Sequence, residues 1–158
     1  MADVNLTSID NNLNVEGSSS ESVNFTDFGG NDTYTLLENL QGDVQIDDND
    51  GATINLPSGL SPSSVIVAST GVQFTINGHN VTISSSDVSQ LNFVFGGTPL
   101  DANAGTTKSF SEMASAFGLT VPSSGSDQVS NPGTVNADGS VGDGGTDTGD
   151  DDTDTGDD

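Results

Sequence analysis

Pairs of large apolar residues at positions i and i+2 recur along the first 95 residues of the chain, and the residue between them is polar in every pair except Val65/Val67. The pairs follow one another after about ten positions, and the spacing is most even over residues 34–56. Because residues i and i+2 lie on the same face of a β-strand, each pair predicts a short strand with one buried face. The pairs are Val4/Leu6, Leu13/Val15, Val23/Phe25, Tyr34/Leu36, Val44/Ile46, Ile54/Leu56, Val65/Val67, Phe74/Ile76, Val81/Ile83 and Leu91/Phe93.

The segments between these pairs are rich in Gly, Asn and Asp, which are the residues that form turns. Short strands at near-constant spacing are typical of two all-β folds. In a β-solenoid or β-roll, two strand-turn units make one coil of about 20 residues, and stacked coils share a continuous core. In an antiparallel β-sandwich, the same strands pair through hairpins. The even step over residues 34–56 favours the solenoid-like stack, with the antiparallel sandwich as the alternative.

Two features predict how the stack closes. Asn77-Gly78 separates two of the strand segments, and this dipeptide is the strongest short hairpin signal, so we expect residues 72–76 and 81–85 to pair antiparallel. Residues 109–118 predict one amphipathic helix, because Ser109 and Glu112 form a capping box and the apolar residues that follow share one face. We expect this helix to cover one end or face of the strands, since the ends of a stack need covering.

The composition changes after residue 122. Residues 123–158 consist mainly of Gly, Asp, Ser and Thr with isolated valines. Such a segment buries too little apolar surface to offset the entropy lost on ordering. The sequence therefore predicts a β-rich domain over residues 1–122 and a disordered acidic tail or linker over residues 123–158.

The chain carries 24 acidic residues and a single basic one, Lys108, for a formal net charge of −23. Nucleic acid is excluded as a partner, because phosphate contacts need Lys and Arg. No run of 18 apolar residues is present, so we expect no membrane insertion. The absence of cysteine excludes disulfides and thiol catalysis. Divalent cations are the partners that this charge favours.

Acidic turns are the candidate site. Calcium binds six to eight oxygen atoms from carboxylates, amides and backbone carbonyls, and turns rich in Asp, Asn and Gly bring such atoms together. In a stacked solenoid, turns one coil apart are neighbours, so carboxylates about 20 residues apart approach each other. The alternative is that these side chains are solvated turn residues. The candidate metal ligands are Asp27, Asp32, Asp47, Asp48 and Asp50.

The segment Gly30–Leu36 resembles the second half of the glycine- and aspartate-rich nonapeptide of repeats-in-toxin (hemolysin-type calcium-binding) proteins. Gly30 matches the third glycine of that repeat, Asp32 its calcium-binding aspartate and Tyr34 its inward apolar residue. Such repeats form a parallel β-roll with calcium in the turns, in proteins exported by type I secretion. The resemblance therefore implies calcium as the ligand of Asp32, and an extracellular location.

The match is partial, because Asp27 and Phe28 stand where the first two glycines belong and only one copy is recognisable. A looser similarity over residues 28–122 is to modules at the ends of large bacterial surface proteins that carry these repeats. The N-terminal segment MADVNLTSID has no basic region followed by an apolar one, so it does not resemble a signal peptide. We expect export to the cell surface or medium without a cleaved N-terminal signal peptide.

The function predicted from these patterns is structural and not enzymatic. No nucleophile elbow, phosphate-binding loop or dinucleotide fingerprint occurs in the sequence. We expect a module of a bacterial extracellular surface or matrix protein that self-associates into a fibre or array, with calcium as the candidate bridging ion. The alternative is a monomeric, calcium-stabilised secretion or spacer domain of a large type I-secreted adhesin or enzyme.

Overall fold

The structure is a computed structural model, and it describes residues 2–5, 12–18, 21–26, 29–97 and 105–142. Strands dominate these ranges, with one α-helix, α1 (Phe110–Ala116), and one short 3-10 helix, η1 (Val88–Gln90). The strands are β1 (Ala2–Asn5), β2 (Asn12–Val15), β3 (Val23–Thr26), β4 (Asp32–Leu36), β5 (Val44–Asp47), β6 (Ala52–Leu56), β7 (Ser64–Ala68), β8 (Gly71–Ile76), β9 (His79–Ser84), β10 (Asn92–Phe95), β11 (Thr106–Ser109), β12 (Ser126–Ser130), β13 (Thr134–Val135) and β14 (Val141–Gly142).

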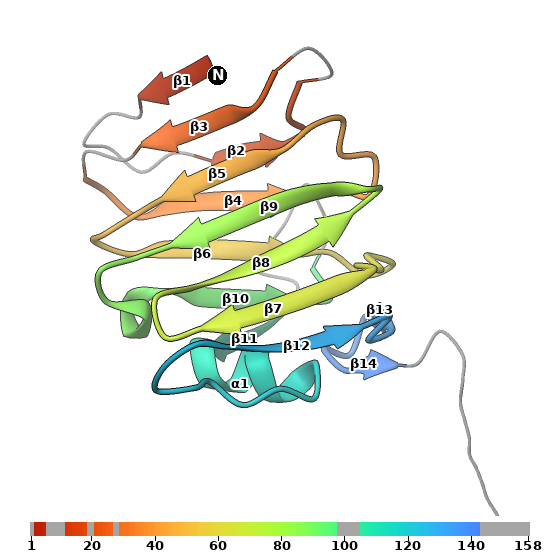
Figure 1. Cartoon of the computed structure of the whole chain (residues 1–158). Coiled ribbons are helices and arrows are strands. Elements are labelled where there is room, and N and C mark those ends of the chain that lie inside the picture. The colour runs from red at the N-terminus through yellow and green to blue at the C-terminus, as the bar shows by residue number, and fades with distance from the viewer. Residues whose placement is uncertain (1, 6–11, 19–20, 27–28, 98–104, 143–158) are drawn as a thin grey trace, which may run out of the picture.

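Two large sheets share one hydrophobic core (Figure 1). The first sheet has the strand order β1-β3-β5-β9-β8-β7-β12, and the second has the order β11-β10-β6-β4-β2. A third, two-stranded sheet consists of β13 and β14. The all-β class predicted from the sequence is confirmed, and the two large sheets are arranged like those of a sandwich.

The chain alternates between the two large sheets from β1 to β6, and its neighbours within each sheet run parallel. Val23 of β3 lies opposite Val44 of β5, so the chain returns to the same position after 21 residues. This pairing differs from the purely antiparallel sandwich that was the alternative expectation. Antiparallel pairing occurs instead among β7, β8, β9 and β12 and between β10 and β11.

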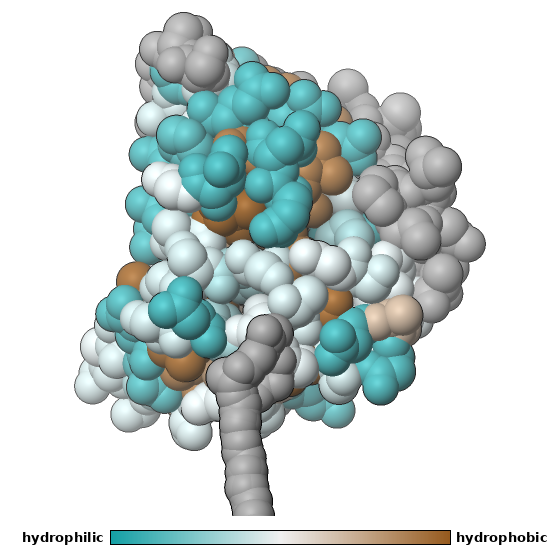
Figure 2. Space-filling view, turned by 90° about the vertical axis from the view of Figure 1, so that its right-hand side faces the viewer, coloured by the Kyte–Doolittle hydropathy of each residue, from teal (hydrophilic) through white to brown (hydrophobic). Residues whose placement is uncertain are grey.

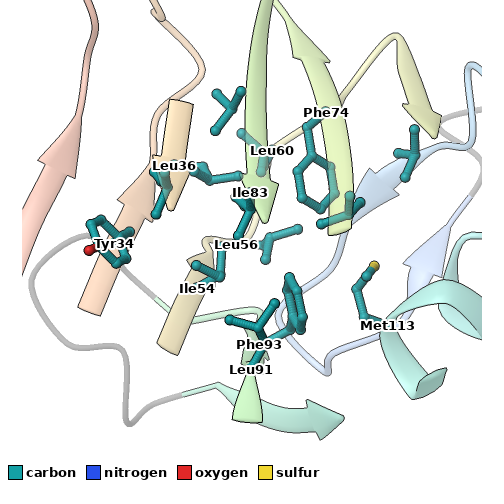
Figure 3. Packing of buried hydrophobic residues seen from close by; sticks show 14 of the residues in the cluster. Tyr34, Leu36, Ile54, Leu56, Leu60, Phe74, Ile83, Leu91, Phe93 and Met113 are labelled. Atoms are coloured by element: carbon teal, nitrogen blue, oxygen red, sulfur yellow. The ribbon is translucent and has the colours of Figure 1, made fainter. Parts of the chain in front are cut away.

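Alternation of apolar and polar side chains places one face of each strand in the core. In β8 every second residue is buried, as the i, i+2 pattern predicts. The buried side chains of successive strands line up across the core, as the labelled residues from Tyr34 to Met113 show in Figure 3. Hydrophilic side chains cover much of the flank seen in Figure 2, with hydrophobic surface showing between them.

Turns also stack on each other along the molecule. The Gln41 backbone N–H donates to the Glu16 carbonyl at 2.7 Å, which connects two turns that are distant in sequence. Gly17 has φ +74°, and a Cβ atom placed on it would lie 2.6 Å from the Gly42 carbonyl oxygen. Glycine is therefore required at this contact both by the backbone conformation and by the space.

The predicted hairpin and helix are both present. β8 and β9 pair antiparallel around Asn77-Gly78, where both residues have positive φ. The Ser109 side chain accepts from the Glu112 backbone N–H, and the Glu112 carboxylate accepts from the Ser109 N–H at 2.8 Å, so the predicted capping box starts α1. The helix covers one end of the core (Figure 1).

The structure describes strands beyond residue 122, in the segment for which the sequence predicted a disordered tail. β12 pairs antiparallel with β7, and Val135 is fully buried. Backbone hydrogen bonds with the edge of β7 and the burial of single valines order this segment, although its composition offers little apolar surface. Residues 143–158 of the predicted tail lie outside the described residues.

Within the described ranges, no helix is long and apolar enough to cross a membrane.

Candidate functional site

The acidic turn after β5 is built around the carboxylate of Asp48. Asp48 Oδ1 accepts hydrogen bonds from the backbone N–H groups of Asp50, at 3.3 Å, and Gly51, at 3.0 Å. This arrangement is an Asx-type turn, in which a side-chain oxygen replaces a backbone acceptor. Gly51 has φ +125°, a conformation that favours glycine. The turn thereby holds the Asp48 side chain inside the protein, where it is fully buried.

A second buried carboxylate lies nearby. Asp32, at the start of β4, is also fully buried and lies opposite Ala52, the residue that follows this turn. The Tyr34 hydroxyl donates to Asp48 Oδ2 at 3.5 Å. Burial raises the pKa of Asp48, and the negative charges of Asp50 and Asp32 raise it further, against the opposing effect of the two backbone hydrogen bonds.

The structure places the predicted ligands in different surroundings. Asp32 and Asp48 are brought together in the protein interior, and Asp50 is exposed in the same turn. Asp47 alternates with the inward Ile46 at the end of β5, so its side chain lies on the outer face of the sheet. Asp27 lies outside the described residues.

Buried carboxylates that approach each other can share a proton, or they can bind a cation that offsets their repulsion. The amide oxygen of Asn31 is close to this turn, since a Cβ atom on Gly51 would lie 3.2 Å from it. Across the part of the chain that the structure describes, no group of three or more His, Cys, Asp or Glu side chains is arranged to hold a metal ion. Calcium binding therefore stays a prediction from the sequence.

A buried polar pair one coil apart was not anticipated from the sequence. The Asn55 side-chain amide donates to the Thr35 hydroxyl at 3.3 Å, and both side chains are buried. The two residues lie opposite each other on β4 and β6. Their separation of 20 residues, each between two apolar residues of a strand pair, is the sequence signal from which this contact is recognisable.

A further feature is the edge of the first sheet at β1, which pairs with β3 alone among the described strands. Val4, Phe25, Ile46 and Ile83 lie opposite one another in successive strands of the first sheet. Their exposed fractions fall from 36% at Val4 to 9% at Phe25 and 0% at the other two. Among the described residues, this apolar row therefore ends in a partly exposed side chain on an edge strand.

Comparison with known proteins gives no relative: no family model matches the chain, and neither a curated protein nor a solved structure is significantly similar to it.

Proposed function

We propose that this chain is a non-catalytic structural module of a bacterial extracellular surface or matrix protein, and that it associates with another copy through a strand edge. The observation that carries this proposal is the exposure of Val4 in a row whose other members are buried. Burial of the apolar side chain and of the free backbone groups of β1 against a further strand supplies the driving force.

We further propose that β1–β6, together with β9 and β10, form a short β-solenoid. The return to the same sheet position after 20 or 21 residues supports this description, as do the parallel pairs on both sheets. β5 pairs with β9 after 37 residues, because β7 and β8 are inserted between these coils. A coil at the end of such a stack lacks a neighbour on one side, so it has an intrinsic tendency to associate.

A secreted, extracellular location is part of this proposal. The support is the cysteine-free, strongly acidic composition together with the partial repeats-in-toxin motif around Asp32. An acidic surface keeps such a module soluble, and it makes contacts between copies sensitive to salt and to divalent cations.

The second candidate is a monomeric module that calcium stabilises, as a secretion or spacer domain. The observation that favours it is the burial of Asp32 and Asp48 near each other. A cation near both carboxylates would offset their mutual repulsion and stabilise the parallel strands. In this case calcium raises the unfolding temperature without changing the size of the particle.

Sedimentation velocity and thermal unfolding of the full chain, in calcium and then in chelator, test these proposals together. Association that increases with protein concentration and with ionic strength supports the structural module. A monomer at every concentration, with or without calcium, would overturn self-association. An unfolding temperature that is the same in calcium and in chelator would overturn calcium stabilisation.

A further inference from the structure

Two hollows adjoin on the outer face of the first sheet, which forms the front layer in Figure 1. The first has a volume of about 220 Å³ and is lined mainly by polar side chains on and beside β5, β8 and β9. The second has a volume of about 210 Å³, and its lining includes Ile66 and Ala68. Gln73 and Thr82 line both hollows. Together the hollows reach the size of a small-molecule site, which is usually about 300–1,000 Å³.

Hydrogen bonds hold the polar side chains around the first hollow. The Gln73 amide nitrogen donates to the Thr82 hydroxyl at 3.1 Å, across the β8–β9 pair. The Thr75 hydroxyl donates to Asn80 Oδ1 at 2.8 Å, and the Asn80 backbone N–H donates to Asp43 Oδ1 at 2.9 Å. Each of these polar groups has further donor or acceptor atoms. The bonds therefore leave Gln73 Oε1, the Asn80 amide nitrogen and Asp43 Oδ2 for a ligand.

Charge is low on this face, although the formal net charge of the chain is −23. The outward positions of β7, β8 and β9 are Ser64, Ile66, Ala68, Gly71, Gln73, Thr75, Asn80, Thr82 and Ser84, all of them uncharged. Among the described residues, Asp43 is the one charged residue that lines either hollow. The acidic chain repels an anionic ligand, and an apolar ligand would leave the polar groups of the first hollow unpaired. The face therefore suits a ligand that is polar and uncharged.

A neutral sugar ring has the chemistry of both hollows. Its hydroxyl groups both donate and accept hydrogen bonds, as the amides and hydroxyls of the first hollow do. Its C–H faces are apolar, like Ile66 and Ala68 in the second hollow. We propose that the outer face of the first sheet, around Gln73 and Thr82, binds an uncharged polysaccharide. This inference goes beyond the proposed self-association and does not depend on it.

Binding of one short sugar chain is expected to be weak. None of the described residues that line the two hollows is aromatic, so the sugar rings have no aromatic ring to pack against. Solvated hydrogen bonds contribute little net free energy, so we expect a dissociation constant on the order of millimolar for an oligosaccharide. A long polymer presents many equivalent units to each site and binds more tightly through avidity.

A nuclear magnetic resonance titration of the isotope-labelled full chain tests this site. The neutral probes are cellohexaose, maltohexaose and N-acetylchitohexaose, and the anionic comparison is oligogalacturonate. We expect at least one neutral probe to shift the backbone amide resonances of residues 43–45, 73 and 80–82. Oligogalacturonate should shift them far less, because the acidic chain repels it.

Two substitutions remove amides that line the first hollow. Gln73→Ala and Gln45→Ala should each weaken binding about two- to tenfold, because each removes hydrogen-bonding groups. Gln90→Ala is the matched control, since Gln90 is exposed and lines neither hollow. Thermal unfolding checks that each variant folds. Gln45 is an exposed side chain, so Gln45→Ala still tests the site if the loss of the bond to Thr82 destabilises Gln73→Ala.

Three results would contradict the proposal. The site is overturned if no neutral probe shifts these resonances well above the expected dissociation constant, or if Gln45→Ala and Gln73→Ala bind as the unchanged chain does. Binding of oligogalacturonate as tight as that of the neutral probes would overturn the choice of an uncharged ligand. Shifts of the same residues by a neutral peptide, without shifts by any sugar, would assign the face to a protein partner instead.

Discussion

At the C-terminal end of the stack, α1 packs three large apolar side chains against the core, whereas at the N-terminal end Val4 remains partly exposed on an edge strand. A helix closes a stack because its own backbone groups are bonded internally and only its apolar face needs a partner. Both sheets also end in a strand at the C-terminal end, at β12 and β11, so the difference between the two ends is the helix that covers the core there. The comparison shows that the N-terminal end keeps a partly exposed apolar side chain, whereas the C-terminal end buries those of its helix.

The largest expected effect is at the closed end. Phe117→Ala removes a ring that contacts Phe74 and Phe95 and is 3% exposed, and should lower the free energy of unfolding by about 3–5 kcal/mol. Urea unfolding, followed by circular dichroism, measures this change. Val4→Ala at the open end is the matched control, and a comparable loss there would contradict the difference between the two ends.

A smaller effect is expected where the closing helix begins. Ser109→Ala removes the side-chain acceptor for the Glu112 N–H and should cost about 1 kcal/mol. Ser115 is an exposed residue within the same helix and away from the cap, so Ser115→Ala provides a control with the same chemical change. Equal unfolding midpoints for the two variants would show that the capping box does not stabilise this end.

The acidic turn tests the parallel part of the stack. The pKa of Asp48 is raised above its ordinary value of 3.8 by burial, so the folded state holds its proton more tightly than the unfolded state does. The stability that this group contributes is complete below pH 3.8 and is lost as the pH rises through the folded-state pKa. At neutral pH the charged carboxylate therefore destabilises the fold.

Asp48→Asn should raise the free energy of unfolding at pH 7 by an amount on the order of 1 kcal/mol, because the amide oxygen still accepts the turn hydrogen bonds and the buried charge is gone. Urea unfolding at pH 7 and near pH 3.5 measures this gain, which should shrink at the lower pH. Asp50→Asn, at an exposed position in the same turn, is the control. A loss of stability in Asp48→Asn at pH 7 would contradict the expected repulsion.

The smallest effect is expected at the open end. Val4→Ala in the monomer should change the free energy of unfolding by less than about 0.5 kcal/mol, because the side chain is 36% exposed and has a strand on one side only. The same substitution should measurably weaken the self-association that we propose for this edge. Thermal unfolding at low protein concentration and sedimentation at high concentration separate the two effects.

Much of this fold could be predicted from the sequence, because the local signals are strong. The i, i+2 apolar pairs marked the strands, Asn77-Gly78 marked the hairpin, and Ser109 with Glu112 marked the helix start. These features depend on residues close together in the chain. In the structure Asp32 and Asp48 lie near enough for the charge of one to affect the pKa of the other, and calcium binding at these residues stays a prediction.

The remaining features depend on partners that are distant in sequence. β12 has one partly buried valine and is ordered by the free edge of β7, which its own composition does not reveal. The Tyr34 hydroxyl reaches Asp48 because the turn folds inward, whereas the adjacent Asp47 points outward. Whether an aspartate faces the core or solvent depends on a one-residue step in register, and composition alone does not fix that step.

The position of β7 and β8 in the chain, between the parallel partners β5 and β9, has a consequence for how the chain acquires its structure. β8 and β9 are joined by Asn77-Gly78, so their contacts are local, whereas each parallel pair must first close a loop of about 20 residues. We expect this hairpin to form early and the strands before it to add toward the N-terminus, with β1 last. Pulsed hydrogen exchange should then show protection in residues 71–84 before residues 23–26. During synthesis, β1, β3 and β5 are therefore made before β8 and β9, the hairpin on which we expect them to assemble.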